Sequence, residues 1–270
     1  MGPFWVLSGE VAVASGTLGA VEIVEFGGTG RPIVVLHALM GRASTWWPCA
    51  AWLTRYGRVL GFDARSHGRN PHRGVWTTED FVGDLVDVLT GLGEPAVLIG
   101  HSMGGLHALG AAASAPTLVR GVVTEDVGVD LVGRTADDWR ALFAEWPVPF
   151  PSLAHVRGFF GPAADYFAEC VEERDGGYRL IADLDDLFGI AEEWGRRDFW
   201  AYVDAVSCPV LAIEAEHSVM PAGQQELIPL RAPGGGRHVV APGAGHLVHG
   251  SAPEFYRGAV EAFLSELLGR

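Results

Sequence analysis

The stretch VLIGHSMGGLHALG, residues 97–110, decides the fold of this chain. It opens with a continuous apolar run, which is typical of a strand buried on both faces of a sheet. It closes with small residues that predict a helix over 103–115. The turn between them reads G-x-S-x-G, and its glycines allow the close backbone approach that a strand–turn–helix connection needs. The pattern favours Ser102 as a nucleophile over an incidental serine in a glycine-rich bend, and it offers the backbone N–H of Met103 to an oxyanion.

Apolar strand patterns alternate with helical patterns on both sides of this stretch. Strands are predicted at 10–14, 20–26, 33–37, 58–63, 96–100, 121–126, 208–214 and 237–241. Helices are predicted to begin near Ser44, to cover 77–93 with Thr78 as N-cap and 103–115, to lie near 222–231, and to run from Pro253 to Leu268. This alternation indicates an α/β fold, with a mostly parallel central sheet of about eight strands, an antiparallel first hairpin and flanking helices.

Residues 129–205 interrupt the alternation with helical patterns, several prolines and many bulky aromatic residues, but with no strong buried-strand signal. We expect an inserted helical cap there, and a core domain made of 1–128 and 206–270. Most of the aromatic residues must pack inside the cap, yet its inner face should line a pocket. The residues expected in this substrate pocket are His37, Trp139, Phe143, Trp146, Phe159 and Phe160.

Composition limits the class of partner. The chain has 270 residues and a net charge of −14, and all 19 of its basic residues are arginine, which disfavours nucleic acid, an anionic membrane surface and polyanionic substrates. The three cysteines are far apart, which fits reduced thiols rather than a disulfide framework or a zinc site. No secretory signal or transmembrane run is apparent. We expect a cytoplasmic protein without cofactor or metal, either a monomer or a homodimer.

A serine nucleophile needs an adjacent base, and ten histidines are available. His246 lies in the glycine-rich segment PGAGH just after the last predicted strand, which places it at the same sheet edge as Ser102. It is therefore the predicted base. His249 is the second candidate, although a role at a helix start or on the surface fits it better. His101 and His37 read as packing residues, and no H-E-x-x-H or spaced Cys/His set indicates a metal site.

Four landmarks, in their order and spacing, resemble those of the α/β-hydrolase family over nearly the full length of the chain. They are HALMG (37–41), DARSHGRN (63–70), GHSMGG (100–105) and PGAGH (242–246). The resemblance implies that the backbone N–H of Leu39 is a second oxyanion donor beside that of Met103. Ala38 stands where the family usually has a glycine, which alters the first landmark slightly.

Two stretches compete for the carboxylate that orients the base. Many family members carry it after the seventh strand, but the corresponding stretch EAEHSVMP (214–221) has Ser218 where the aspartate usually stands. Another branch carries it after the sixth strand, where TEDVGV (124–129) aligns Asp126 with that acid. Neighbouring side chains in a strand point to opposite faces, so Glu125 and Asp126 cannot both face one histidine. Asp126 is the predicted acid; the alternatives are Glu216, Glu214 and Glu125.

Together these residues predict acyl transfer through a covalent intermediate, most commonly the hydrolysis of a carboxylic ester. The aromatic cap and the acidic composition favour a small to medium, largely apolar acyl group. A carbon–carbon bond hydrolase or lyase, a perhydrolase or an acyltransferase would use the same residues. A receptor that binds a small apolar ligand without turnover would keep the same fold.

Overall fold

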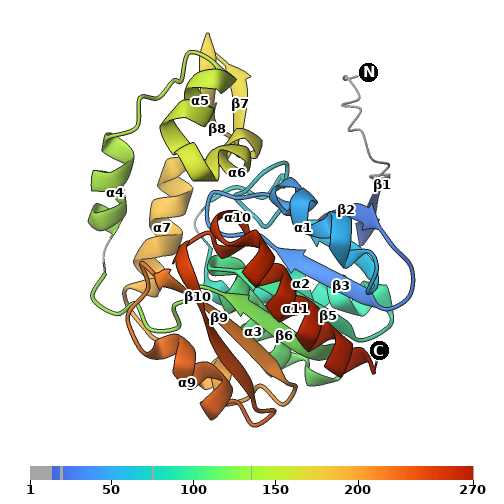
Figure 1. The fold of residues 1–270 in the computed structure, drawn as a ribbon. Coiled ribbons are helices and arrows are strands. Elements are labelled where there is room, and N and C mark those ends of the chain that lie inside the picture. The colour runs from blue at the N-terminus through green and yellow to red at the C-terminus, as the bar shows by residue number, and fades with distance from the viewer. Residues whose placement is uncertain (1–13, 19–20, 75, 135, 270) are drawn as a thin grey trace.

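The computed structural model describes residues 14–18, 21–74, 76–134 and 136–269. One eight-stranded sheet runs through its centre in the order β1-β2-β4-β3-β5-β6-β9-β10. The strands are β1 (Ala14–Leu18), β2 (Val21–Gly27), β3 (Pro32–Leu36), β4 (Arg58–Phe62), β5 (Ala96–His101), β6 (Val119–Glu125), β9 (Val210–His217) and β10 (Gly236–Gly245). β2 is antiparallel to β1 and β4, and all other neighbours are parallel (Figure 1). The predicted α/β class, with its antiparallel first hairpin, is confirmed.

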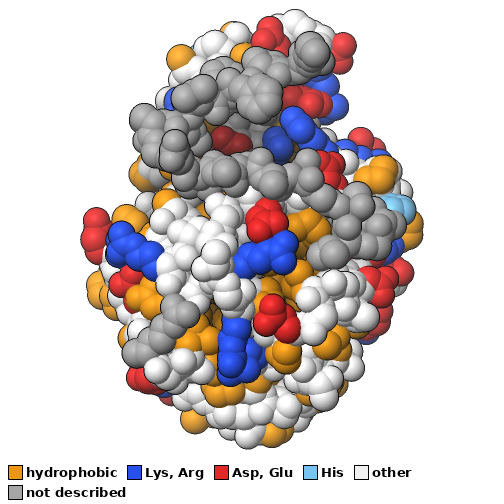
Figure 2. All heavy atoms as spheres, turned by 90° about the vertical axis from the view of Figure 1, so that its right-hand side faces the viewer, with side chains coloured by type: hydrophobic (Ala, Val, Ile, Leu, Met, Phe, Trp, Pro, Cys, Tyr) orange, Lys and Arg blue, Asp and Glu red, His pale blue; other side chains and the backbone are white. Residues whose placement is uncertain are grey.

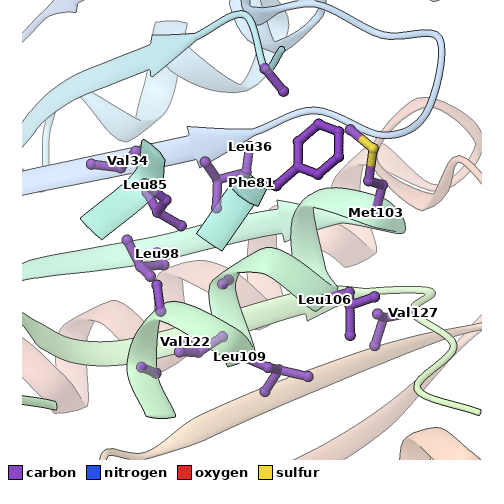
Figure 3. Close-up of a cluster of buried hydrophobic side chains, with 14 of the residues drawn as sticks. Val34, Leu36, Phe81, Leu85, Leu98, Met103, Leu106, Leu109, Val122 and Val127 are labelled. Atoms are coloured by element: carbon purple, nitrogen blue, oxygen red, sulfur yellow. The ribbon is translucent and has the colours of Figure 1, made fainter. Parts of the chain in front are cut away.

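Helices cover both faces of this sheet, as parallel strands require. They are η1 (Ala43–Trp46), α1 (Trp47–Leu53), α2 (Thr78–Leu92), α3 (Met103–Ser114), η2 (Pro116–Leu118), α9 (Gln224–Arg231), α10 (Val248–Ser251) and α11 (Pro253–Leu268). Alternating side chains of β3 go to opposite faces. Val34 packs in a cluster with residues of α2 and α3, and Val35 packs in a second cluster with residues of α1 and α11. Figure 3 shows part of the first cluster, where Leu85 of α2 lies near Val34 and Leu98.

The chain between β6 and β9 builds the upper part of the molecule in Figure 1. Its elements are α4 (Ala136–Ala144), α5 (Leu153–Phe160), η3 (Gly161–Ala163), α6 (Ala164–Glu169), β7 (Val171–Arg174), β8 (Gly177–Leu180), α7 (Leu184–Trp194) and α8 (Trp200–Val203). We call residues 129–205 the cap. The β7–β8 hairpin corrects the expectation of a purely helical cap. Its strands have four residues each, too short for a clear pattern, and are joined by Asp175 and Gly176 at positive φ.

Helix α7 packs against both the cap and the sheet. Phe188 lies in an apolar cluster with cap residues such as Phe143 and Phe150. Leu187 and Ile190, on the opposite side of the helix, lie in the cluster that covers one face of the sheet. We therefore propose the division into a core domain and a cap with α7 as the helix that contributes to both apolar clusters.

The first predicted strand lies almost entirely outside the described residues, and the N-cap of α2 differs from its prediction. The strand predicted at 10–14 lies outside the described residues except for Ala14, which begins β1. The N-cap of α2 is Thr77, not Thr78: its side chain accepts a hydrogen bond from the N–H of Asp80, whose carboxylate accepts from the N–H of Thr77. This capping box satisfies two donors at the start of the helix. The hydroxyl of Thr78 donates instead to Glu193 of α7, at 2.6 Å.

Candidate active site

Ser102 sits on a strained turn between β5 and α3. Its φ is 50° and its ψ is −116°, a conformation that non-glycine residues rarely adopt. The turn is held by close packing on both sides: a Cβ on Gly100 would lie 2.3 Å from the carbonyl oxygen of Gly104, and one on Gly104 would lie 2.3 Å from that of Leu36. The N–H of Ser102 also donates to the carbonyl oxygen of Glu125 at 2.8 Å. Such strain persists only where the surroundings enforce it, which is common at active sites.

A Gly104→Ala substitution is expected to destabilise the protein by about 1–3 kcal/mol, because the new methyl group meets the backbone of Leu36, which cannot move without disturbing β3. Gly83→Ala is the matched control: Gly83 lies in α2, and nothing is within 4 Å of its added Cβ. The control is expected to gain about 0.5–1 kcal/mol from better helix propensity. Urea unfolding of both variants measures the difference, and equal stabilities would contradict the close-packed turn.

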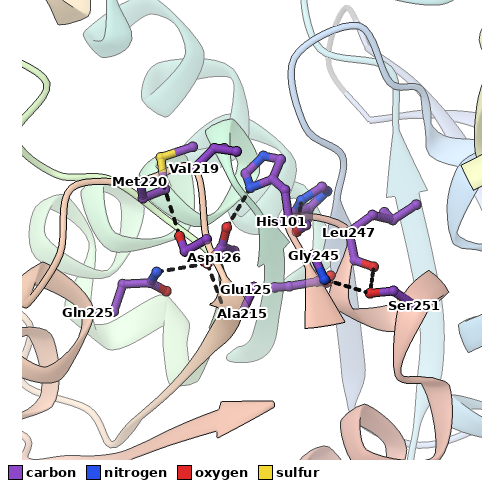
Figure 4. A network of polar contacts seen from close by, with 12 residues as sticks. His101, Glu125, Asp126, Ala215, Val219, Met220, Gln225, Gly245, Leu247 and Ser251 are labelled. Carbon is purple, nitrogen blue, oxygen red and sulfur yellow. Dashed lines mark hydrogen bonds and ion pairs between the residues drawn. The ribbon is translucent and has the colours of Figure 1, made fainter. Parts of the chain in front are cut away.

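His246 and Asp126 form a direct pair. Nδ1 of His246 lies 2.6 Å from Oδ2 of Asp126, and the carboxylate is fully buried. The other oxygen, Oδ1, accepts from the N–H of Ala215 at 3.0 Å and from Nε2 of Gln225 at 2.9 Å (Figure 4). Burial alone would raise the pKa of Asp126, but the His246 bond and these two donors bring its pKa below the ordinary value.

This pairing fixes which nitrogen of His246 carries a proton. A carboxylate only accepts hydrogen bonds, so Nδ1 of His246 is the donor. In a neutral imidazole, Nε2 is then free to accept a proton. His246 and Ser102 both line one cavity, which brings the predicted base and nucleophile to the same place.

The structure places the other candidate acids away from His246. Both oxygens of Glu125 face Nδ1 of His249, at 2.9 and 2.8 Å, so these two residues form a pair of their own. Glu214 lies 2.7 Å from Nε2 of His238. Glu216 accepts from the N–H of Gly243 and is exposed. Glu125 and Asp126 thus pair with different histidines: Glu125 is the last residue of β6, and Asp126 follows it with a positive φ of 44°.

Two backbone amides are available near Ser102. Met103 is the first residue of α3, a position whose N–H has no partner within the helix. Leu39 lies in the loop after β3, next to Met40 with a φ of 72°, and it lines the same cavity as Ser102. Among the described residues, neither amide donates a hydrogen bond. The two amides thus remain the candidates for the oxyanion donors.

His37 holds the loop of Leu39 instead of lining the cavity. It is 3% exposed. Its Nε2 accepts from the N–H of Ala64 at 3.0 Å, and its Nδ1 lies 2.8 Å from the carbonyl oxygen of Ala38. Burial lowers the pKa of His37, which keeps the ring neutral as these two bonds require. The sequence predicts His37 in the substrate pocket, but His37 does not line the cavity.

The cavity at Ser102 has a volume of about 410 Å³ and mostly apolar walls. Three of the predicted pocket residues line it: Trp139, Trp146 and Phe160. The other two cap residues do not. Phe143 is 7% exposed and packs inside the cap, whereas Phe159 is 44% exposed and points away. Lining residues that the sequence did not single out include Met40, Leu142, Tyr166, Phe167, Val219 and Leu247.

Three buried side chains beside this site have the donor atoms of a metal site. His101, Glu125 and His249 each offer one atom, and these atoms lie within 4.8 Å of one another. Glu125 and His249 already bond to each other, so a metal ion would have to replace that pair.

A family model described as the alpha/beta hydrolase family matches residues 33–259. The chain belongs to the alpha/beta hydrolase family. The named relatives of this alpha/beta hydrolase include esterases and a diacylglycerol lipase.

The alpha/beta hydrolase is similar to proteins of several named activities. An sn-1-specific diacylglycerol lipase of Danio rerio is 34% identical over 171 residues, or 62% of this chain and 54% of that protein, so the match spans about half of the relative's length. Esterase YbfF of Escherichia coli (strain K12) is 28% identical over 87% of this chain and 93% of its own. A solved structure of E-2-(acetamidomethylene)succinate hydrolase superposes with a TM-score of 0.82 at 23% identity. The match covers 94% of this chain and 99% of that chain, and it supports the fold alone.

Proposed function

We propose that this alpha/beta hydrolase cleaves carboxylic esters with Ser102 as nucleophile, His246 as base and Asp126 as the orienting acid. The observation that carries the proposal is the 2.6 Å pair of His246 and Asp126, which lies beside a serine on a strained strand–helix turn. These are the three groups that acyl transfer by serine requires.

The chemistry divides into two steps. Oγ of Ser102 bonds to the ester carbonyl carbon while His246 takes the hydroxyl proton. The amides of Leu39 and Met103 stabilise the oxyanion that forms. The bond to the alcohol oxygen breaks, His246 protonates the leaving alcohol, and an acyl-enzyme remains. Water then attacks the acyl carbon in the same way, which releases the acid and restores Ser102.

The cavity supports an uncharged, largely apolar acyl group. Its walls are mainly aromatic and aliphatic, and none of the described residues that line it is an arginine. A carboxylate on the acyl chain would lose its hydration there without gaining a cationic partner. Relatives named as a lipase and an esterase are consistent with this substrate class.

Two p-nitrophenyl esters of matched length test this assignment. The enzyme is expected to hydrolyse p-nitrophenyl butyrate, and to hydrolyse p-nitrophenyl hemisuccinate at a kcat/KM at least about tenfold lower, because the second ester brings a charge into an apolar cavity. Esters from acetate to dodecanoate then locate the optimum acyl length. A preference for the hemisuccinate would contradict the proposed substrate class.

Labelling with a fluorophosphonate tests the nucleophile independently of the substrate. Modification of Ser102 in the wild type, and none in a folded Ser102→Ala variant, is expected. Folded wild-type protein that is neither labelled nor active on any ester would favour a receptor that binds without turnover and would end the proposal.

A cytoplasmic location and a small-molecule partner complete the proposal. All three cysteines (Cys49, Cys170 and Cys208) are free and buried, which fits a reducing compartment. Among the described residues, no helix combines the length and the apolar character needed to cross a bilayer. Among the described residues on the face drawn in Figure 2, arginine and acidic side chains are interspersed.

A further inference from the structure

A second carboxylate–histidine pair lies directly beside the first. Strand β6 ends at Glu125, and Asp126 follows it. Glu125 is fully buried and accepts from both the backbone N–H and Nδ1 of His249, each at 2.9 Å. His246 and His249 are three residues apart in the segment that leads into α10. Two consecutive carboxylates, at and just beyond the end of β6, therefore hold two histidines of one short segment.

His101 holds the same segment at a third point. Its Nε2 lies 3.0 Å from the carbonyl oxygen of His246, and a carbonyl oxygen only accepts, so Nε2 carries the proton. Burial lowers the pKa of His101 to about 3, so the ring is neutral and this N–H is its single donor. The imidazole of His246 is thus bound through Nδ1 by Asp126, while its backbone is bound by His101.

Glu125 connects this segment to the nucleophile. Its backbone carbonyl oxygen accepts the N–H of Ser102 at 2.8 Å, while its side chain holds His249. The ring of His249 is stacked on Trp46 at 4.6 Å and meets the ring of His101 edge-on at 5.7 Å. A buried carboxylate is costly unless it is paired, so its place here has a structural purpose. Movement of His249 would be transmitted to both the base and the serine turn.

We propose that His101, Glu125 and His249 are positioning residues that set the orientation of His246 toward Ser102. The proposal rests on the proposed serine mechanism. His101 borders the cavity with only 3% of its surface exposed, and Glu125 and His249 do not line it, so the main effect of the three is on the geometry of proton transfer rather than on substrate binding. A small misplacement of a catalytic group can lower the rate by about 100-fold. Loss of these contacts should therefore lower kcat and leave KM almost unchanged.

The test replaces His101 in two ways. His101→Met keeps the approximate volume but removes the donor, and His101→Gln places an amide N–H near the position of Nε2. With p-nitrophenyl butyrate, we expect His101→Met to lower kcat at least about tenfold with KM within about twofold, and His101→Gln to stay within about threefold of the wild type. His155→Met is the matched control: His155 is an exposed residue of the cap helix α5, and its substitution should change neither constant.

A second pair of variants covers a failure of His101→Met to fold. His249→Asn keeps a donor near the position of Nδ1, and His249→Ala removes it; the first should retain kcat and the second should lower it about tenfold. Equal kcat values within each pair, at equal Tm, would overturn the proposal because packing alone would then explain the three residues.

Fluorophosphonate labelling separates this failure from failure of the proposed function. If the wild type is labelled at Ser102 while the donor-lacking variants keep full kcat, only the positioning role is overturned. If the folded wild type is not labelled at Ser102, the serine mechanism fails and the positioning role fails with it.

Discussion

Ser102→Ala is expected to lower kcat for p-nitrophenyl butyrate by about 10⁴–10⁶-fold. The variant lacks the oxygen that bonds to the ester carbon, and no other hydroxyl stands on the strained turn between β5 and α3. Residual hydrolysis would come from the cavity and the two oxyanion amides, which still stabilise attack by water. Steady-state kinetics of the purified variant, with its Tm measured in parallel, checks the prediction.

Ser114→Ala is the control for this experiment. Ser114 is the exposed last residue of α3, the helix that begins immediately after Ser102. The kcat of the Ser114→Ala variant should equal that of the wild type. A Ser102→Ala variant that keeps more than a small fraction of activity at an unchanged Tm would show that Ser102 is not the nucleophile.

Asp126→Asn is expected to lower kcat by about 10³–10⁴-fold while the fold is retained. An asparagine oxygen at the position of Oδ1 can still accept from Ala215 and Gln225. Its NH₂ group then faces Nδ1 of His246, which must become an acceptor. The proton of the imidazole moves to Nε2, and His246 can no longer take the proton of Ser102.

Glu216→Gln is the matched control, because it makes the same chemical change on an exposed carboxylate near the end of β9, the strand that the sequence offers as the alternative place for the acid. We expect its kcat to stay within about twofold of the wild type. The reverse result, with Glu216→Gln slow and Asp126→Asn active, would move the acid to Glu216.

The sequence predicts the core of the fold and the catalytic candidates because these depend on local patterns. Buried strands and amphipathic helices each have their own period, and Ser102 stands between one of each. The choice of Asp126 over Glu125 depends on strand alternation, which also operates within a few residues. In the structure, Asp126 faces His246 and Glu125 faces His249, but β6 ends at Glu125 and Asp126 turns away at a φ of 44°, which the local pattern does not predict.

The pocket depends on contacts between segments that are distant in the sequence. Phe159 and Phe160 are consecutive in α5, yet Phe159 is 44% exposed and Phe160 lines the cavity. Only the docking of α5 on its neighbours decides which ring turns inward. The same limit applies to His37, whose partner Ala64 is 27 residues away. The pairing of Glu125 with His249, across 124 residues, has no signal in the local pattern.

Asp126, the proposed acid, follows β6 but is in direct contact with the neighbouring strand β9. The two strands are parallel neighbours, and the N–H of Ala215 in β9 donates directly to Asp126. A carboxylate after either strand therefore approaches the same histidine segment from almost the same direction. A change of the acid from one strand to the other would therefore leave the pairing of β6 with β9 intact.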